Sequence, residues 1–355
     1  MYHVALCCSG GGGAMQLAVA VRSVLETHSQ ADLVRVHIVW EHLTEEELGL
    51  LRESWHPWSQ QVSFYRASEY LGEKALSGYY GYYFRWWLCE ILPESVERVL
   101  YLDYDIIVKK DLAPLWSLEL GDYLAGAVPD SGSQYLKSVL GAYAPTIGVE
   151  YSQDLPYFNT GVLFMNLRAW KEKAVAATLD ERFADLRPHD SLEGPKLHDQ
   201  TEFNLIFHDQ VLALSPTWNL LELVNSFDEW CTEIYRELDE PSNYFDPRVV
   251  HFAGPWKAFT RWRRSSEKES FYSLLDRTAW SGWRSENDRT LKGKLFSQLL
   301  ECHWLVCRGY ILGFVPDYKS RLWKLVRSNP LLPIIYLVVP ANRMRHRVLD
   351  WWRSL

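Results

Sequence analysis

Long apolar stretches are missing from this sequence. A helix that crosses a bilayer needs about 20 consecutive apolar residues, whereas the apolar run near the C-terminus, residues 331–339, is nine residues long and contains Pro333. The first residues also lack the basic segment that opens a secretory signal. We therefore expect a cytoplasmic protein that does not span a membrane.

Cysteine is scarce and shows no useful pattern. The six cysteines have neither the paired spacing of a metal site nor that of a disulfide framework, and Cys7 and Cys8 are adjacent within an apolar run. We interpret them as small core residues in a reducing compartment. The sequence also lacks internal repeats and low-complexity tracts. None of its motifs is of a kind that reads a nucleic-acid groove, so nucleic acid is not an expected partner.

Aromatic residues, by contrast, are abundant. The 355 residues are 48% hydrophobic and 23% charged, which is ordinary for a soluble protein with one large domain or two smaller ones. Tryptophan is unusually frequent, at 17 residues. Because tryptophan suits positions with one apolar and one wet edge, this frequency favours a sugar-binding surface or a membrane interface.

Charge is divided unevenly along the chain. From residue 291 onward there are eleven basic and three acidic residues, a net charge of +8, which leaves −16 for the preceding residues out of a total of −8. The same segment contains many tryptophan and leucine residues. Such a composition predicts a basic appendage that lies in the interface of an anionic membrane. Two alternatives are a helical lid packed on the main domain and a homodimer surface.

Apolar, β-prone segments alternate with helix-like segments, which predicts an α/β fold with a mostly parallel, doubly wound sheet. The helix that follows Thr44 begins with the spacing of a capping box. The predicted strands are residues 4–8, 34–40, 62–66, 98–102, 123–128, 211–214 and an apolar strand after Gly161; the predicted helices include 14–27, 79–92, 168–183, 201–207 and 267–280.

A glycine-rich turn separates the first strand from the first helix. Ser9 is followed by Gly10, Gly11, Gly12 and Gly13. Strand, glycine-rich turn and helix form the opening of an α/β unit that binds a nucleotide, and backbone N–H groups there could face phosphate. The run matches neither the dinucleotide-binding nor the P-loop pattern, so a flexible turn is the alternative.

Two aspartates follow the apolar segment 98–102. Asp103 and Asp105 are separated by one residue, and in an extended strand such residues face the same side. Two neighbouring carboxylates repel each other unless a positive charge lies between them, and oxygen ligands suit a hard divalent cation such as Mn²⁺ or Mg²⁺. The alternative is a solvated turn that happens to carry two acids.

A second landmark lies far along the chain, where the predicted strand 248–251 ends at His251 and is followed by Gly254 and Lys257. A neutral imidazole can bind a metal, glycine lets the backbone approach a ligand, and lysine can neutralise phosphate. A structural histidine at a strand end is the alternative.

Four motifs, taken together, resemble the family 8 retaining glycosyltransferases, which include bacterial lipopolysaccharide glucosyl- and galactosyltransferases. The resemblance covers about residues 4–280. The motifs are Tyr-Leu-Asp-Tyr-Asp (101–105), Phe-Asn-Thr-Gly-Val-Leu-Phe-Met-Asn-Leu (158–167), Asp-Gln-Thr-Glu-Phe-Asn (199–204) and His-Phe-Ala-Gly-Pro-Trp-Lys (251–257).

The resemblance implies a GT-A fold, a single nucleotide-sugar-binding domain with a mostly parallel mixed sheet, in residues 1–285. It implies that Asp103, Asp105 and His251 bind Mn²⁺ (or Mg²⁺), which bridges the diphosphate of a UDP-sugar. Donor contacts would come from Ser9, Gly10, Gly11, Asp103, Tyr104, Gly254 and Lys257, and the sugar and acceptor pocket from Arg85, Asp130, Asn159, Asp199 and Gln200.

Within that pocket, the resemblance implies that Arg85 and Asp199 pair over sugar hydroxyls and that Gln200 lies beside the reacting carbon. Each residue also has an ordinary interpretation: Asn159 as a turn former, Asp199 as a helix cap and Arg85 as a surface charge. The glycine-rich turn and the residues after Lys257 depart from the family pattern, which bears on how uridine is held.

We therefore expect a hexosyltransferase that moves glucose or galactose from a UDP-sugar to a lipid-linked or lipopolysaccharide acceptor. Residues 286–355 would form a helical, basic and aromatic extension in peripheral contact with the inner face of the cytoplasmic membrane. The alternatives are a metal-dependent nucleotidyl- or phosphotransferase and a non-catalytic nucleotide-sugar-binding protein.

Overall fold

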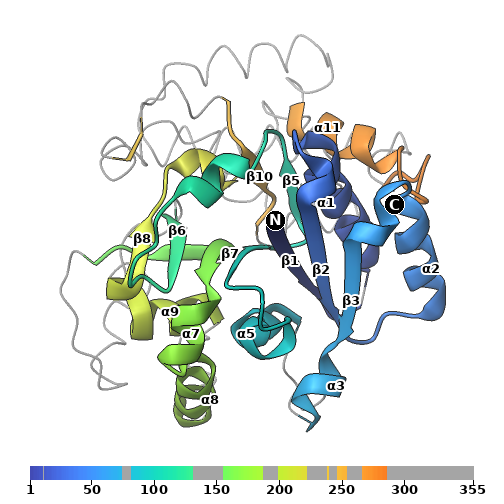
Figure 1. Ribbon diagram of the computed structural model, residues 1–355. Coiled ribbons are helices and arrows are strands. Elements are labelled where there is room, and N and C mark those ends of the chain that lie inside the picture. Colours follow the sequence, from blue (N-terminus) through green and yellow to red (C-terminus); the bar gives the residue numbers. More distant parts are fainter. Residues whose placement is uncertain are drawn as a thin grey trace, which may run out of the picture. The chain divides into compact units, whose positions relative to one another are not determined.

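The computed structural model describes residues 1–10, 12–73, 81–130, 155–186, 199–221, 238–239, 246–253 and 266–285 (Figure 1). The chain divides into two compact units, Met1–Lys257 with Ser270–Trp283, and Ala258–Glu269 with Arg284–Leu355. The elements named below belong to the first unit, except for the first four residues of the last helix. The predicted extension, 286–355, lies outside the described residues, and the expected boundary at residue 285 stays a prediction.

A seven-stranded mixed sheet forms the centre of the first unit, with the strand order β3-β2-β1-β4-β7-β6-β8. Neighbouring strands from β3 to β4 are parallel, β7 is antiparallel to both of its neighbours, and β6 is parallel to β8. The mostly parallel α/β sheet predicted from the sequence is therefore confirmed. The strands are β1 (Tyr2–Cys8), β2 (Val34–Trp40), β3 (Val62–Arg66), β4 (Arg98–Leu102), β6 (Ala125–Pro129), β7 (Phe158–Asn166) and β8 (Val211–Ala213).

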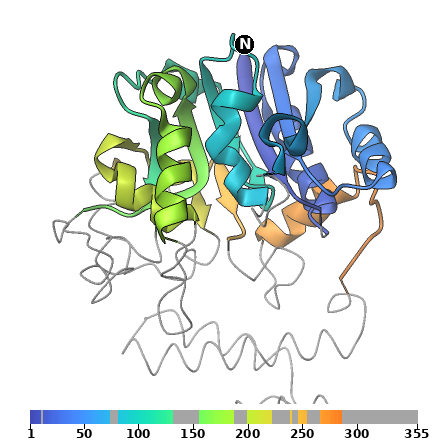
Figure 2. The same cartoon turned by 90° about the horizontal axis from the view of Figure 1, so that it is seen from below.

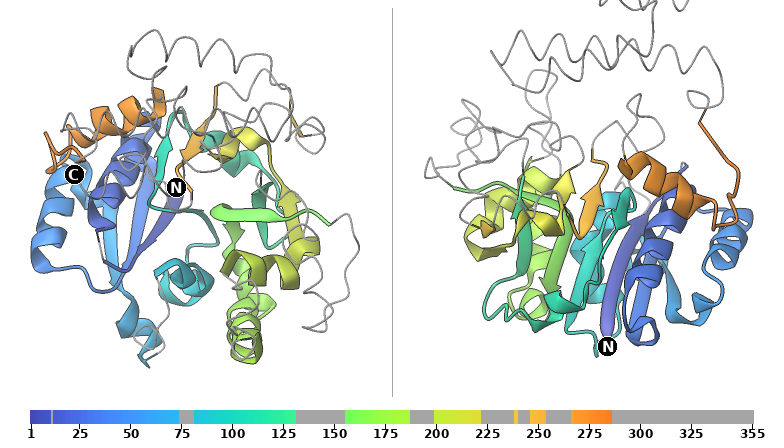
Figure 3. Two further views of the ribbon diagram at one scale, coloured as in Figure 1. Left: turned by 180° about the vertical axis from the view of Figure 1, so that it is seen from behind. Right: turned by 90° about the horizontal axis from the view of Figure 1, so that it is seen from above.

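Helices cover both faces of this sheet, because alternate side chains of each strand point to opposite faces. Ala5 and Cys7 of β1 join one apolar cluster with residues of α5, α7, α8 and α9, whereas Leu6 and Cys8 join another with residues of α1 and α2. Figures 2 and 3 show helices on the two opposite faces of the sheet. The helices are α1 (Ala14–Thr27), α2 (Glu45–Ser54), α3 (Ala67–Leu71), α5 (Leu88–Ile91), α7 (Leu167–Glu172), α8 (Val175–Leu186), α9 (Asp199–Phe207) and α11 (Ser266–Leu275).

A second, three-stranded sheet joins segments that are far apart in sequence. Its order is β5-β10-β9, with β5 (Ile106–Val108), β9 (Leu220–Leu221) and β10 (Val249–His251). β10 is antiparallel to β5, with His251 opposite Ile106, and parallel to β9, with His251 opposite Leu221. This small sheet, which was not predicted from the sequence, places His251 next to the residues that follow β4.

Several local predictions are confirmed and others are wrong. Thr44 and Glu47 form the predicted capping box of α2, and Cys7, Cys8 and Cys89 are free and buried. The helix predicted at 79–92 is instead the 3₁₀ helix η3 (Gly81–Trp87) followed by one turn of α5, within the described residues 81–92. The helix predicted at 168–183 is broken between α7 and α8, where Ala174 has a φ of 50°.

A pair of histidines on the sheet leads to a prediction about pH. His37 of β2 is buried; its Nε2 lies 3.0 Å from Nδ1 of His3, and its Nδ1 lies 3.1 Å from the Tyr65 hydroxyl. Burial, with a smaller effect of His3, lowers the pKa of His37 from 6.5 to about 4. Between these values the unfolded chain binds a proton that the folded chain does not, so the free energy of unfolding should fall on acidification, by on the order of 3 kcal/mol.

Urea unfolding of the wild type and of His37→Gln at pH 7 and pH 4.5 tests this prediction. The two proteins differ only at residue 37, so the difference between their pH dependences reports His37 together with its contact to His3. The variant should lose less stability on acidification than the wild type. Equal losses would contradict the assignment.

Candidate active site

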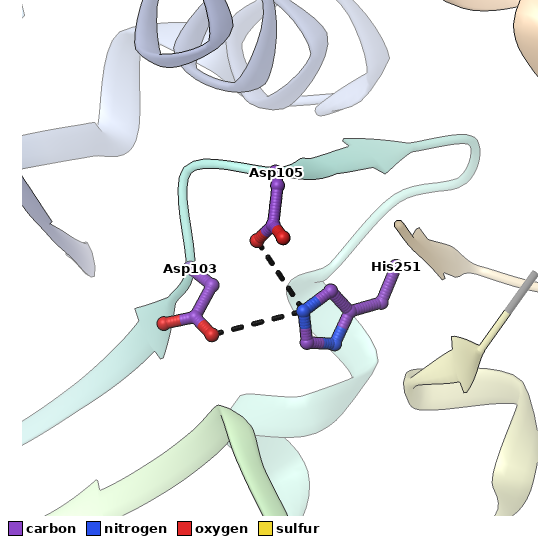
Figure 4. A group of neighbouring side chains, drawn as sticks. All are labelled: Asp103, Asp105 and His251. Carbon is purple, nitrogen blue, oxygen red and sulfur yellow. Dashed lines mark ion pairs between the residues drawn. The ribbon is translucent and has the colours of Figure 1, made fainter. Parts of the chain in front are cut away.

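Two carboxylates and an imidazole from distant parts of the chain converge on one point (Figure 4). One ligand atom each from Asp103, Asp105 and His251 lies within 4.8 Å of the other two. His251 Nε2 is 3.7 Å from Asp103 Oδ2 and 3.3 Å from Asp105 Oδ1. Asp105 and His251 are buried, with 7% and 3% of their side chains exposed, whereas Asp103 is 25% exposed. The group is thus open to solvent mainly at Asp103.

The two aspartates lie in the turn between β4 and β5. This placement corrects the sequence argument, which assumed that alternation along an extended strand would bring them together. Instead, the Asp103 N–H donates to the Gly161 carbonyl at 2.7 Å, and the Asp105 carbonyl accepts from the Phe252 N–H at 2.9 Å. The first bond ties the turn to β7 and the second ties it to the residue after β10, so both sheets orient the carboxylates.

Arg85 holds the carboxylate of Asp103 from the other side. Its Nη2 is 3.1 Å from Asp103 Oδ1 and 3.3 Å from Asp199 Oδ2, and the guanidinium is 4.5 Å from the ring centre of Tyr101. Burial alone would lower the pKa of Arg85, but the adjacent carboxylates, Asp103 foremost, raise it above its usual value. Arg85 is therefore a charged residue with 2% exposure and not a surface charge.

Tyr101 completes the environment of Asp103. Its hydroxyl donates to Asp103 Oδ1 at 2.6 Å. Burial raises the pKa of Tyr101 well above its ordinary value, so the hydroxyl keeps its proton at neutral pH. Because Oδ1 faces Arg85 and Tyr101, Oδ2 is the oxygen that faces His251.

Helix α9 is fixed against β7, and this fixes Asp199 and Gln200 in its first turn. The side chain of Asn204 pairs with the backbone of Phe158 in the manner of a strand, accepting from its N–H at 2.7 Å and donating to its carbonyl at 2.8 Å. Phe203 is fully buried and stacks on Trp86, with ring centres 5.1 Å apart. Phe203 and Asn204, the Phe-Asn pair that ends the third motif, therefore hold α9 in place.

Asn159, Asp130 and Gln200 form one hydrogen-bonded group. Asp130 Oδ2 accepts from Asn159 Nδ2 and from Gln200 Nε2, both at 3.0 Å. Gln200 Oε1 accepts from the backbone N–H of Thr160 at 3.2 Å. The residues that sequence reasoning assigned to the sugar pocket therefore do come together, and Asn159 lies within β7 instead of forming a turn.

The bend in β7 explains how this strand reaches the aspartates. Ala127 and Val128 are adjacent on β6, but their partners on β7 are Leu163 and Asn159. Residues 160–162 therefore do not pair with β6, although Val162 still pairs with Leu102 of β4. A Cβ atom on Gly161 would lie 2.2 Å from His251 Cε1 and 2.8 Å from Asp103 Oδ2. Only glycine leaves room for the imidazole and the carboxylate at this point.

Asn219 is a site residue that sequence reasoning missed. It lies between the 3₁₀ helix η8 (Pro216–Trp218) and β9, is 2% exposed, and its Oδ1 is 3.0 Å from His251 Nδ1. An isolated asparagine in a loop carries no pattern of its own. Its position directly after Trp218 is the one sequence feature that could have drawn attention to it.

The structure describes some of the residues that were predicted to contact the nucleotide-sugar donor. Gly10 has a φ of 80°, and a Cβ there would lie 2.6 Å from the His42 carbonyl oxygen, so this position requires glycine. A Cβ on Gly81 would lie 2.7 Å from Ser9 N, and a Cβ on Gly13, just before α1, would lie 3.4 Å from Tyr104 Cζ. Gly11, Gly254 and Lys257 lie outside the described residues.

The three converging side chains fit a divalent cation. Ligand atoms bound at right angles to one ion at about 2.1 Å are about 3 Å apart, close to the 3.3 and 3.7 Å separations here. Two carboxylates and one imidazole are also a donor set that such ions accept. The alternative interpretation, a solvated turn that happens to carry two acids, does not account for a buried imidazole next to both of them.

Comparison with known proteins identifies the family. The model of glycosyl transferase family 8 matches residues 4–263, which is well over half of the chain. The chain belongs to glycosyl transferase family 8. The family expected from the four motifs is thereby confirmed, and so is the enzyme class, glycosyltransferase.

Relatives of this family 8 chain include enzymes and one protein named for stress. General stress protein A of Bacillus subtilis (strain 168) is 26% identical over 200 residues, 54% of this chain and 63% of that protein. Glycosyltransferase GlyF of Streptococcus pneumoniae serotype 4 is 33% identical over 184 residues, 51% and 39% of the two chains. Lipopolysaccharide 1,2-glucosyltransferase of Escherichia coli is 26% identical over 268 residues, 74% and 75%. The chain thus spans less than two thirds of the first two relatives.

Solved structures share the fold. The galactosyltransferase LgtC, in complex with donor and acceptor sugar analogs, superposes with a TM-score of 0.61 and 23% identity over 81% of this chain and 99% of LgtC. The bifunctional glycosyltransferase WbbM gives a TM-score of 0.57 and 19% identity over 79% and 50% of the two chains. The expected GT-A fold is confirmed. Among the described residues, no helix is long and apolar enough to cross a membrane.

Proposed function

We propose that this protein is a retaining hexosyltransferase that moves glucose or galactose from a UDP-sugar to a lipid-linked or lipopolysaccharide acceptor. The convergence of Asp103, Asp105 and His251 carries the proposal, because transfer from a nucleotide sugar leaves charge on a diphosphate. The names of the Escherichia coli glucosyltransferase and of LgtC support a hexose and a glycan acceptor.

Mn²⁺ is the proposed cation, with Mg²⁺ as the weaker candidate. Both ions accept carboxylate oxygens, but an imidazole ligand favours a transition metal over Mg²⁺. Asp103 Oδ2, Asp105 Oδ1 and His251 Nε2 would hold it. When bound, the ion supplies Lewis-acid stabilisation of the leaving UDP.

The chain's own residues would orient the donor sugar. Asp130 and Asp199 are carboxylates that accept hydrogen bonds from hydroxyl groups, and Arg85 holds Asp199 in place. Gln200, fixed by Thr160 and Asp130, would lie beside the reacting carbon. Gly254 and Lys257 would contact the diphosphate, together with backbone of Ser9, Gly10 and Gly11 and the side chain of Tyr104.

The proposed chemistry avoids a covalent glycosyl-enzyme. Asp130 Oδ2 accepts two amide N–H groups, and Asp199 Oδ2 faces Arg85, so both carboxylates hold neighbouring side chains and we assign neither as a nucleophile. The acceptor hydroxyl would attack on the face from which UDP departs, and the departing phosphate would take the hydroxyl proton. This path retains the anomeric configuration.

A donor-turnover assay with the full-length protein tests the proposal. UDP-glucose, UDP-galactose and other UDP-sugars are incubated with Mn²⁺, with Mg²⁺ or with chelator, and UDP release is measured. We expect Mn²⁺-dependent release from at least one hexose donor. Release of phosphate or pyrophosphate from nucleoside triphosphates instead would favour a phospho- or nucleotidyltransferase. Calorimetric binding of UDP and Mn²⁺ without turnover would favour a non-catalytic binding protein.

We also propose that the basic segment after residue 290 attaches the enzyme to the inner face of the cytoplasmic membrane, where a lipid-linked acceptor would be found. Its net charge of +8 and its tryptophans support this role. Full-length protein should sediment with anionic liposomes, and a protein ending near Leu291 should not. If both stay in solution, the segment instead packs on the domain or forms a dimer.

A further inference from the structure

Asn219 connects the imidazole of the cation site to β7 through two hydrogen bonds. Its Oδ1 is 3.0 Å from His251 Nδ1, and its Nδ2 donates to Asn159 Oδ1 at 2.8 Å. Asn159 in turn donates to Asp130. All four side chains are buried, at 9% exposure or less. A continuous relay therefore runs from the predicted metal ligand to the predicted sugar residues.

A backbone group fixes the direction of every bond in this relay. The Gly161 N–H, which can only donate, lies 2.9 Å from the side-chain atom of Asn159 that also contacts Asn219. That atom must be the carbonyl oxygen of Asn159. Asn219 must therefore present its NH₂ group to Asn159 and its own carbonyl oxygen to His251.

The direction of the relay decides which nitrogen of His251 carries the proton. An amide oxygen only accepts hydrogen bonds, so Nδ1 must be the donor. A neutral imidazole has one N–H group, which leaves the lone pair on Nε2. Nε2 is the nitrogen that lies 3.3 Å from Asp105 Oδ1 and 3.7 Å from Asp103 Oδ2. The lone pair thus faces the point where the two carboxylates meet.

We infer that Asn219 is a positioning residue that selects the Nδ1–H tautomer of His251 and so forms the cation site before the cation binds. This inference rests on the cation of the proposed function. Groups that accept from the second nitrogen of a metal-binding histidine fix its tautomer and ring orientation. Gln200 is two hydrogen bonds further along than Asn159 and has a second anchor, because its Oε1 also accepts from the Thr160 N–H.

Three substitutions at residue 219 separate this role from simple packing. Asn219→Ala and Asn219→Leu both remove the acceptor, and leucine keeps the volume of the side chain. Asn219→Asp keeps an oxygen acceptor for Nδ1–H while it loses the bond to Asn159. Asn166→Ala is the matched control: Asn166 is a buried asparagine at the opposite end of β7 from Asn159, where it caps α7 through the Ala169 N–H.

Mn²⁺ binding is measured for each full-length protein by the electron paramagnetic resonance signal of the free ion. We expect the alanine and leucine variants to bind Mn²⁺ about tenfold to a hundredfold more weakly. Asn219→Asp and Asn166→Ala should stay close to the wild type. Unchanged affinity in Asn219→Leu, or an equal loss in Asn219→Asp, would overturn the inference.

The tautomer is measured separately in cation-free protein. Nitrogen NMR of ¹⁵N-histidine-labelled protein at alkaline pH distinguishes the two tautomers, and the His251→Gln variant identifies the signal of His251. The wild type should show Nδ1–H, and Asn219→Leu should show a mixture or Nε2–H. An Nε2–H tautomer in the wild type would overturn the inference. If the wild type bound no Mn²⁺, the cation of the proposed function would be wrong, whereas this measurement would still decide the role of Asn219.

Discussion

Asp105→Asn is expected to reduce Mn²⁺-dependent turnover by roughly a thousandfold or more, since a bound cation contributes several kcal/mol to the stabilisation of a charged leaving group. Asparagine has nearly the shape of aspartate but replaces a charged oxygen by a neutral amide. Asp105 Oδ1 lies 3.3 Å from His251 Nε2 in a buried position. Among the described residues, the group that could hold the cation contains one other carboxylate, that of Asp103, which is already part of the site. Asp103→Ala and His251→Ala should have the same effect.

Stability measurements keep this result from being mistaken for unfolding. Asp103 and Asp105 repel each other in the cation-free protein, so Asp105→Asn should unfold at the same or a higher temperature than the wild type. Asp246→Asn is the control, because Asp246 is 73% exposed and pairs with Lys110. The control should keep full turnover. Normal turnover and Mn²⁺ affinity in Asp105→Asn would remove the cation from the mechanism.

Gly161→Ala is expected to inactivate the enzyme through geometry alone. The new methyl group would lie 2.2 Å from His251 Cε1 and 2.8 Å from Asp103 Oδ2, so the imidazole, the carboxylate or β7 must shift. A misplacement of about 1 Å in a catalytic site can cost about a hundredfold in rate. Overpacking of a buried position should also cost about 1–3 kcal/mol of stability. Turnover, Mn²⁺ affinity and urea unfolding should therefore all be affected.

Gly126→Ala separates the two effects. Gly126 lies on β6, next to β7, and the three atoms nearest to an added Cβ would all belong to the side chain of Leu214, the first at 3.0 Å. Because that side chain can move, this variant should lose some stability but keep its Mn²⁺ affinity. If Gly161→Ala kept both turnover and Mn²⁺ affinity, the close contact of Gly161 with the site would have no functional meaning.

Local patterns in the sequence predicted local structure well. The glycine-rich turn and the apolar period of residues 14–27 predicted β1 and α1 because both signals lie within a few residues of the element itself. The helix predicted at 168–183 is broken at Ala174, which has a φ of 50° although neither glycine nor proline marks the break. Residues 83–87, around Arg85, are all buried and form part of a 3₁₀ helix, and nothing in their sequence distinguished this structure from the α-helix predicted at 79–92.

The candidate site could be predicted only in part. Asp103 and Asp105 are visible as a pair, but His251 is joined to them by a resemblance to a family and not by any pattern of spacing. The physical connection is the three-stranded sheet, whose two- and three-residue strands are too short to show periodicity. Asn219 was missed for the same reason, because its importance depends on the pairing of β9 with β10.

The three-stranded sheet also determines when the cation site can form during synthesis. Strands β1 to β4 can pair as soon as the first hundred or so residues have emerged, but β5 must wait for β10, which lies more than 140 residues downstream. Contacts between such distant segments form slowly because a long loop must close. A nascent chain with its parallel strands in place therefore lacks the imidazole ligand, and tight cation binding reports that β10 has paired with β5.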